Sequence, residues 1–174
     1  MKAFLYRVCA IFFSHFVLYP DYRISFFIPL AFRFADYKRD ILPQATRDAI
    51  KDSKDIVVSG WIKKSEIPYY YSMLDVFVFP SHREGFGMCV LEASAMEKPI
   101  LDSRAHGCVD AIVEHETGEY INLSAEGICR GMELMLDADL RKRLGENGRK
   151  RVLEWYDFKI MWPLVGDLYK KILK

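Results

Sequence analysis

The sequence predicts an α/β protein built around a parallel, doubly wound sheet of the Rossmann-like type. The main observation is an alternation along the chain, in which apolar runs of about four to six residues are followed by helix-like segments of about ten or more. Glycine or proline marks many of the boundaries between them. The chain contains neither an internal repeat nor a low-complexity tract. In such a sheet, the loops at the carboxyl ends of the strands carry the ligand site.

The size and composition of the chain fit one domain, or one domain with an appendage. It has 174 residues, of which 51% are hydrophobic and 28% charged, so it can bury a substantial core. The net charge of +1 gives no reason to expect a nucleic-acid partner. The four cysteines lie far apart in sequence and form no CxxC pair, so the sequence suggests no zinc site. Their spacing favours a reducing, cytoplasmic location. They are Cys9, Cys89, Cys108 and Cys129.

The N-terminal residues 3–19 are rich in apolar and aromatic side chains, so a membrane anchor or signal peptide has to be considered. Arg7 and His15 interrupt the run, which is also shorter than a spanning helix usually requires. We expect a buried helix over 3–17, terminated by the Tyr-Pro-Asp sequence at 19–21. Peripheral contact with the inner face of a membrane stays open as an alternative.

The predicted strands begin with two neighbouring candidates at 22–28 and 30–35. The sequence does not settle which of the two enters a sheet, because Pro29 between them would interrupt a central strand. Later apolar runs are short and bounded by glycine, proline or serine, which is typical of buried strands. They lie at 55–60, 75–79, 99–101 and 118–121.

Helices are predicted between and after these strands, mostly from apolar periodicity. They are expected at 43–52, 65–73, 88–96, from about 109, and at 124–136, 139–153 and 158–173. Ser65 is a candidate N-cap for its helix, and Asp139 for the helix that follows it. Asp137 and Asp139 resemble a metal-binding pair, but they lie between two helices and not after a strand, so we predict no metal site.

The helix over 139–153 carries a basic cluster. Such a cluster could attract anionic lipid head groups. Because Glu146 and Glu154 share the helix, a solvated helical face is the expected interpretation. The cluster consists of Arg141, Lys142, Arg143, Arg149, Lys150 and Arg151.

The stretch EGFGMCVLE, from Glu84 to Glu92, carries most of the chemical information. It joins the strand predicted at 75–79 to the helix predicted at 88–96 through a glycine-rich turn. A helix N-terminus in that position offers free N–H groups and a dipole to an anion such as phosphate. The two carboxylates could then accept hydrogen bonds from sugar hydroxyls. Alternatively, Glu84 is only a favourable charge at a helix N-terminus and Glu92 an ordinary helix residue.

With this turn in place, residues 58–121, VSGW to GEYI, resemble the C-terminal, donor-binding half of a GT-B glycosyltransferase. The nearest family is the large retaining group 1, also called family 4. The resemblance is strong over about 55–122, weaker over 19–54, and extends to the closing helices. It divides the chain into a poorly matched N-terminal helix and strand, 1–35, and a nucleotide-sugar-binding domain with C-terminal helices, 36–174.

The resemblance implies roles for the residues of the glycine-rich turn. Glu84 would hold the transferred sugar and is the candidate catalytic residue, and Glu92 would bind the ribose hydroxyls. Because glycine has no side chain, the backbone of the turn can approach the sugar closely at its two glycines. The further donor-binding candidates here are Gly85, Phe86, Gly87 and Met88.

Two other loops are implicated by the same resemblance. Gly60, Trp61 and Ile62 would meet the nucleotide base, although Trp61 could equally be a core side chain. His106 and Gly107, in the loop over 103–110, would close over the donor, although a solvated loop histidine is the simpler alternative.

The chain also departs from the family pattern. No stretch matches the acceptor-binding domain, and no residue before Tyr19 matches the Arg and Lys that the family places on the diphosphate. Glu97 stands where the family commonly has glycine. We therefore expect a truncated or split retaining glycosyltransferase that acts in polysaccharide or glycolipid synthesis. It would use a nucleotide-diphosphate sugar as substrate, no other cofactor, and a separate acceptor-domain chain. Activity of the chain alone stays open, and the alternative is a non-catalytic nucleotide-sugar-binding module or a decayed fragment.

Overall fold

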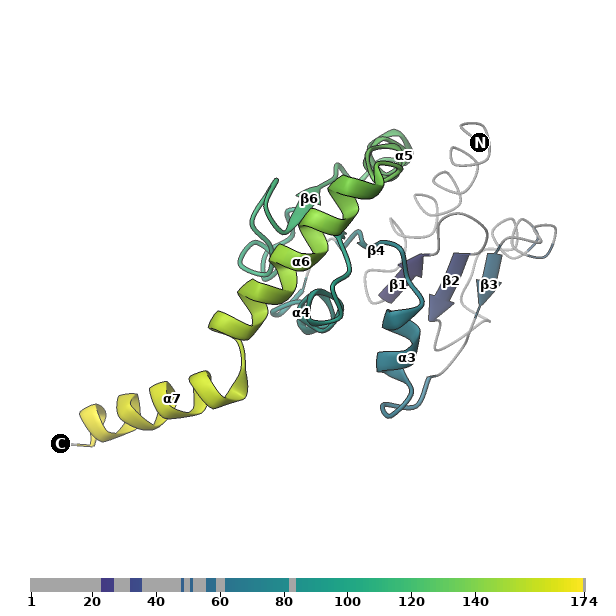
Figure 1. The fold of residues 1–174 in the computed structure, drawn as a ribbon. Coiled ribbons are helices and arrows are strands. Elements are labelled where there is room, and N and C mark those ends of the chain that lie inside the picture. Colours follow the sequence, from purple (N-terminus) through teal and green to yellow (C-terminus); the bar gives the residue numbers. More distant parts are fainter. Residues whose placement is uncertain are drawn as a thin grey trace.

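The computed structural model describes residues 23–26, 32–35, 48, 51, 56–58, 62–81 and 84–173 (Figure 1). The helix predicted over 3–17 lies outside the described residues. Of the helix predicted over 43–52, Asp48 and Lys51 are described, and both are helical.

Three parallel strands form the sheet beside the candidate site. They follow the order β4-β5-β6, with Phe79 opposite Asp102 and Asp102 opposite Tyr120. Both ladders run parallel, as the alternation of strands and helices predicts. The strands are β4 (Phe77–Phe79), β5 (Ile100–Asp102) and β6 (Gly118–Tyr120).

A second set of strands has the order β1-β2-β3, and β1 lies beside β4. β2 and β3 pair in parallel, as expected of the predicted fold, whereas β1 and β2 form an antiparallel pair that the sequence did not predict. Both candidates around Pro29 become strands. Only residues 27–31 separate them, and a parallel pair would need a crossover of a dozen or more residues. The strands are β1 (Arg23–Phe26), β2 (Phe32–Ala35) and β3 (Ile56–Val58).

The described helices follow the predicted order. The structure differs from the prediction at the N-termini of three predicted helices. Glu66 and not Ser65 occupies the N-cap of the first, without a side-chain hydrogen bond. Asp137 caps α6 by accepting from the N–H groups of Asp139 and Leu140, so Asp139 is not the cap. The helices are α3 (Ile67–Ser72), α4 (Met88–Ala95), α5 (Ala125–Leu134), α6 (Ala138–Trp155) and α7 (Phe158–Ile172).

The helix predicted from about Val109 is the third difference, because residues 106–111 form consecutive turns instead. Hydrogen bonds from Cys108 N to Ala105 O and from Ala111 N to Cys108 O span three residues each. Gly107 has a φ of 93°, which an α-helix excludes. The segment is therefore a folded loop, which the next subsection places in the site.

The core lies between the β4-β5-β6 strands and α4. Phe77, Phe79, Val90 and Ile100 are each at most 1% exposed. The two phenylalanine rings stack with their centroids 5.9 Å apart. This packing fixes the start of α4 relative to the carboxyl ends of the strands, where the candidate site lies.

Helix α6 crosses α4 closely, because small residues face the contact. A Cβ on Gly145 would lie 2.2 Å from the carbonyl oxygen of Glu97, at the end of α4. Glu97 adopts a left-handed φ of 58°, the conformation in which glycine is ordinarily favoured. This agrees with the expectation that Glu97 replaces a glycine.

The arginines of α6 anchor that helix to the backbone of the rest of the domain. Arg141 donates to Met135 O at 2.6 Å, and Arg143 donates to His115 O at 3.0 Å. Arg149 donates to the carbonyl of Ala95, and Arg151 donates to that of Asp110 at 2.8 Å. The guanidinium groups are thus structural anchors and not a free patch for lipid head groups. The lysines of the cluster remain exposed at the surface, as Lys142 and Lys150 show.

Helix α7 extends away from the sheet and the other helices in Figure 1. No residue of α7 is buried, and its large apolar side chains face solvent. Among them, Trp162 is 69% exposed and Leu164 60% exposed. Within the described residues, no helix is both long and apolar enough to cross a membrane.

Candidate donor site

The glycine turn, residues 84–88, leads directly into α4. Gly87 occupies the N-cap with a left-handed φ of 64°, and no side chain caps the helix. Within the first turn, Val90 N donates to Gly87 O at 2.8 Å, and no side chain caps the N–H groups at the start of α4, as the sequence predicts for an anion site. Phe86 and Met88 are exposed, and Gly87 is buried.

The β5 loop, residues 103–110, packs against the glycine turn. A Cβ on Gly107 would lie 2.3 Å from the carbonyl oxygen of Glu84, so the two backbones touch only because residue 107 is glycine. Glu84 N donates to His106 O at 3.3 Å. A Cβ on Gly87 would lie 3.0 Å from Cys108 Sγ. The structure thus brings the candidates of the turn together with His106 and Gly107.

Glu92, the second carboxylate, lies on α4 and is half-buried. Tyr71 of α3 donates a hydrogen bond of 2.9 Å from its hydroxyl to Glu92 Oε2. Ile62 is also half-buried, whereas Gly60 and Trp61 lie outside the described residues. The predicted contact with a nucleotide base in this loop therefore stays a prediction.

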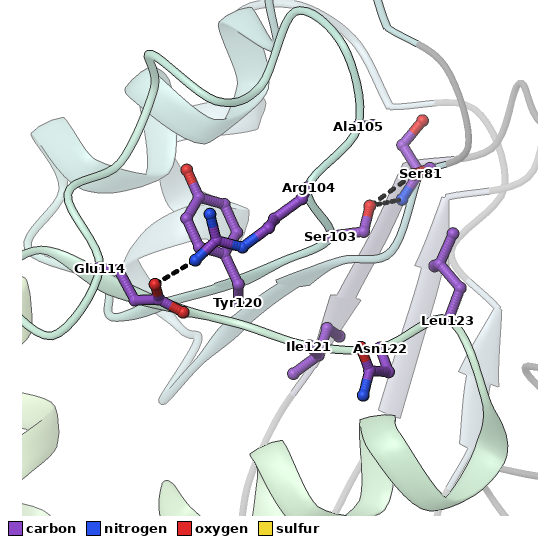
Figure 2. Close-up of a pocket in the computed structure, with 9 residues that line it drawn as sticks. All are labelled: Ser81, Ser103, Arg104, Ala105, Glu114, Tyr120, Ile121, Asn122 and Leu123. Atoms are coloured by element: carbon purple, nitrogen blue, oxygen red, sulfur yellow. Dashed lines mark hydrogen bonds and ion pairs between the residues drawn. The ribbon is translucent and has the colours of Figure 1, made fainter.

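A cavity that the sequence analysis did not identify opens at the carboxyl ends of β4, β5 and β6 (Figure 2). Its volume is about 380 Å³. Apart from Glu114, which precedes β6, the lining residues follow or end a strand, and that position is the signal that could have indicated the cavity. The lining residues are Ser81, Ser103, Arg104, Ala105, Glu114, Tyr120, Ile121, Asn122 and Leu123.

The polar groups of this cavity are largely paired with one another. Arg104 forms an ion pair with Glu114, and its guanidinium carbon lies 4.5 Å from the centre of the Tyr120 ring (Figure 2). The Ser103 hydroxyl accepts from Ser81 N at 2.9 Å and donates to Ser81 O. Burial, followed by the charge of Asp102, raises the pKa of Tyr120.

Asp102 is the unusual group of the site. Its side chain is wholly buried, and neither carboxylate oxygen has a hydrogen-bond partner among the described residues. Burial raises the pKa of Asp102 to about 7, while the neighbouring Ser103 N–H and Cys108 thiol act in the opposite direction. Burial, and then the charge of Asp102, raise the pKa of Cys108 above its usual value.

Comparison with known sequences assigns residues 47–151 to the family described as glycosyl transferases group 1. The capsular polysaccharide biosynthesis glycosyltransferase CapM of Staphylococcus aureus is 37% identical over 107 residues, which are 60% of this chain and 28% of CapM. An N,N'-diacetylbacillosaminyl-diphospho-undecaprenol alpha-1,3-N-acetylgalactosaminyltransferase of Campylobacter jejuni is 34% identical over 64% of this chain and 30% of its own length. The chain thus spans less than a third of these relatives.

Solved structures show the same fold. Sucrose-phosphate synthase from Thermosynechococcus elongatus superposes with a TM-score of 0.73 at 22% identity, over 97% of this chain and 42% of its own. The C-terminal domain of the group 1 protein LpcC from Francisella tularensis gives a TM-score of 0.65 at 27% identity, over 88% of this chain and 79% of that domain. The chain therefore belongs to the group 1 glycosyltransferases and has the fold of the C-terminal half of a GT-B enzyme.

Proposed function

We propose that this chain is the donor-binding half of a retaining glycosyltransferase and binds a nucleotide-diphosphate sugar at the glycine turn and the β5 loop. The observation that carries the proposal is the start of α4. It has no side-chain cap, its N-cap is a left-handed glycine, and a second glycine loop lies against it. Backbone N–H groups in such a place suit a phosphate or a sugar oxygen.

The site residues take the roles that the family resemblance implies. Glu84 is assigned to the transferred sugar and Glu92 to the ribose hydroxyls. Carboxylates suit these roles because charge-assisted hydrogen bonds to hydroxyls are short and strong. Ile62, with Gly60 and Trp61, is assigned to the base.

The proposed reaction transfers the sugar to an acceptor hydroxyl with retention of configuration. The bond between the anomeric carbon and the diphosphate oxygen breaks, and the nucleoside diphosphate leaves with the bonding electrons. The acceptor oxygen then bonds to the same face of the anomeric carbon, and its proton passes to the leaving phosphate. No protein nucleophile is needed, so the chain contributes orientation and stabilisation of the positive charge that develops on the sugar.

The substrate class rests on the relatives. Their names include capsular polysaccharide biosynthesis, an undecaprenol-linked acceptor, and the lipopolysaccharide core mannosyltransferase LpcC of Rhizobium leguminosarum. HepE of Anabaena, which shares the fold at 13–14% identity, was crystallised with UDP and with UDP-glucose. We assign the chain to polysaccharide or glycolipid synthesis at the cytoplasmic face of a membrane. A separate acceptor-domain chain would complete the site, and residues 36–174 would form the donor domain.

Calorimetric titration with UDP-, GDP- and ADP-sugars tests donor binding directly. We expect saturable binding to one nucleotide class, which Glu92→Ala weakens by about 1–3 kcal/mol. Glu146→Ala removes an exposed carboxylate on α6 and serves as the matched control, with unchanged affinity. A folded chain that binds none of these donors would refute the proposal.

A non-catalytic nucleotide-sugar-binding module is the second candidate. The ion pair of Arg104 with Glu114 favours this candidate, because Arg104 lies at the carboxyl end of β5 and is paired there with a carboxylate and not free for a diphosphate. Binding of a donor without transfer, even after an acceptor-domain chain is supplied, would select this candidate. Transfer of radiolabelled sugar in that mixture would exclude it.

A further inference from the structure

The carboxyl group of Asp102 lies buried at the end of β5, where the β5 loop begins. Its main chain is used by the sheet, because Ile121 N donates to Asp102 O at 2.7 Å. Its side chain is not used in this way, since both carboxylate oxygens are buried without a hydrogen-bond partner among the described residues. A buried group of this kind is costly when charged and much less so when neutral.

The Ser103 N–H and the Cys108 thiol favour the charged form of Asp102, but burial outweighs both. Glu84, from the glycine turn, acts on it as a like charge, and the thiol of Cys108, from the β5 loop, is its neighbour. Tyr120 faces it from β6. The neighbour on β4 is the apolar Phe79.

More distant charges do not alter this balance. Cys89, from α4, acts on Cys108. Arg104 acts on the Tyr120 hydroxyl and is itself paired with Glu114. Burial therefore dominates, which agrees with the raised pKa of Asp102 of about 7.

Asp102 is also placed to act on the contact between the β5 loop and the glycine turn. Cys108, its neighbour, is the residue whose sulfur meets Gly87, and Gly107 beside it touches Glu84. A charged Asp102 needs water or a donor, and the loop that covers it is the same loop that closes on the turn. Movement of this loop would hydrate the carboxylate and separate the two halves of the donor site.

We propose that Asp102 is a positioning residue for the donor site: its neutral form lets the β5 loop close on the glycine turn, and its ionisation opens that contact. The consequence for donor binding rests on the function proposed above. Asp102 acts through Gly107 and Cys108 and touches no substrate. The chain would thus bind donor more tightly in mildly acidic than in mildly alkaline solution.

The first test is donor affinity as a function of pH. If only the neutral form is competent, affinity falls about tenfold between pH 6 and pH 8, because the competent fraction falls by that factor. Asp102→Asn, which imitates the neutral carboxyl, abolishes the fall. Two controls should retain the fall in affinity between pH 6 and pH 8. Asp110→Asn removes an exposed carboxylate of the same loop, and His106→Gln removes the loop histidine. A pH-independent wild type, or a fall that persists in Asp102→Asn, would overturn the proposal.

A second test counts protons directly and separates ionisation from a purely structural role. Calorimetry at pH 8 in two buffers of different ionisation enthalpy should show uptake of close to one proton per donor bound. Asp102→Asn should show none, and equal uptake in both proteins contradicts the assignment.

Hydrogen exchange without donor distinguishes failure of this proposal from failure of the proposed function. After correction for the intrinsic pH dependence, amides of residues 84–90 and 103–111 should lose protection between pH 6 and pH 8 in wild type only. Loss of protection in a chain that binds no donor would support the role of Asp102 in the loop and reject the donor site. Unchanged protection would reject the loop movement itself.

Discussion

The hydroxyl of Tyr71 donates a hydrogen bond of 2.9 Å to Oε2 of Glu92, and this bond joins α3 to α4. The Tyr71 ring is buried and meets Phe77 edge-on, with centroids 5.6 Å apart. A fixed phenol therefore orients a half-buried carboxylate before any ligand arrives, which is the arrangement that a binding site needs from its supporting residues.

Tyr71→Phe should keep the fold and weaken donor binding. The ring and its packing remain, while Glu92 loses one hydrogen bond, worth about 0.5–1.5 kcal/mol. Calorimetry should show this loss as a roughly two- to twelvefold rise in Kd. In the double variant with Glu92→Ala, the Tyr71→Phe change should have no further effect on affinity. Independent, additive losses would mean that Tyr71 does not act through Glu92.

Gly107→Ala should destabilise the protein by about 2–4 kcal/mol. The new Cβ would meet the carbonyl of Glu84 at 2.3 Å, and alanine is strained at a φ of 93°. Urea denaturation followed by circular dichroism measures the effect. Stability equal to that of wild type would show that the β5 loop does not pack on the glycine turn as described.

Gly85→Ala is the matched substitution in the glycine turn, with the opposite expectation for stability. No atom lies within 4 Å of the added Cβ, so the free energy of unfolding should change by less than about 1 kcal/mol. Donor affinity should nevertheless fall, because the methyl group occupies space that the sugar would approach. Unchanged affinity would remove Gly85 from the donor site.

Asp102→Asn should stabilise the protein at neutral and alkaline pH. Because the pKa of Asp102 is raised to about 7 in the folded state, that state binds more protons than the unfolded chain between about pH 4 and pH 7. The stability of wild type therefore falls as the pH rises through this window, by as much as about 4 kcal/mol. Urea titrations at pH 4.5 and pH 8 should show a smaller fall in the free energy of unfolding for the variant than for wild type. An equal fall in both proteins would contradict ionisation of a buried Asp102.

Glu97→Gly should raise the free energy of unfolding by about 0.5–1 kcal/mol. Glycine removes the strain of a left-handed φ of 58°, and the exposed ion pair with Arg149 that is lost contributes little. Glu116→Gly, at an exposed position without a positive φ, provides the control and should lower stability. Thermal unfolding of the two variants checks the sign.

The sequence predicted the helices and strands that have a clear apolar periodicity or are bounded by glycine or proline. The turn that opens α4 and the strands before and after it were predicted because buried strands and helix starts leave local signals. The pairing of β1 with β2 was not, since a strand has the same pattern in either direction. The helix expected near Val109 was wrong because residues 106–111 form consecutive turns, which no local pattern distinguishes from the start of a helix.

Other features depend on contacts that no local pattern reveals. The arginines of α6 read as a basic cluster, yet their partners are backbone carbonyls such as Ala95 O, more than fifty residues away. The cavity beyond Ser103 assembles from three strand ends. The strand predicted at 99–101 excludes Asp102, which is the last residue of β5 and fully buried. Aspartate is depleted in strands, so no local pattern indicates this position.

The exposed apolar side chains of α7 also govern the colloidal behaviour of the isolated chain. Surface of this kind drives association in water, and a net charge of +1 supplies almost no repulsion against it. Sedimentation should therefore vary with protein concentration, and polar substitutions at Trp162 and Leu164 should remove that dependence. The solubility of this domain thus depends on α7, which contributes no residue to the glycine turn or the β5 loop.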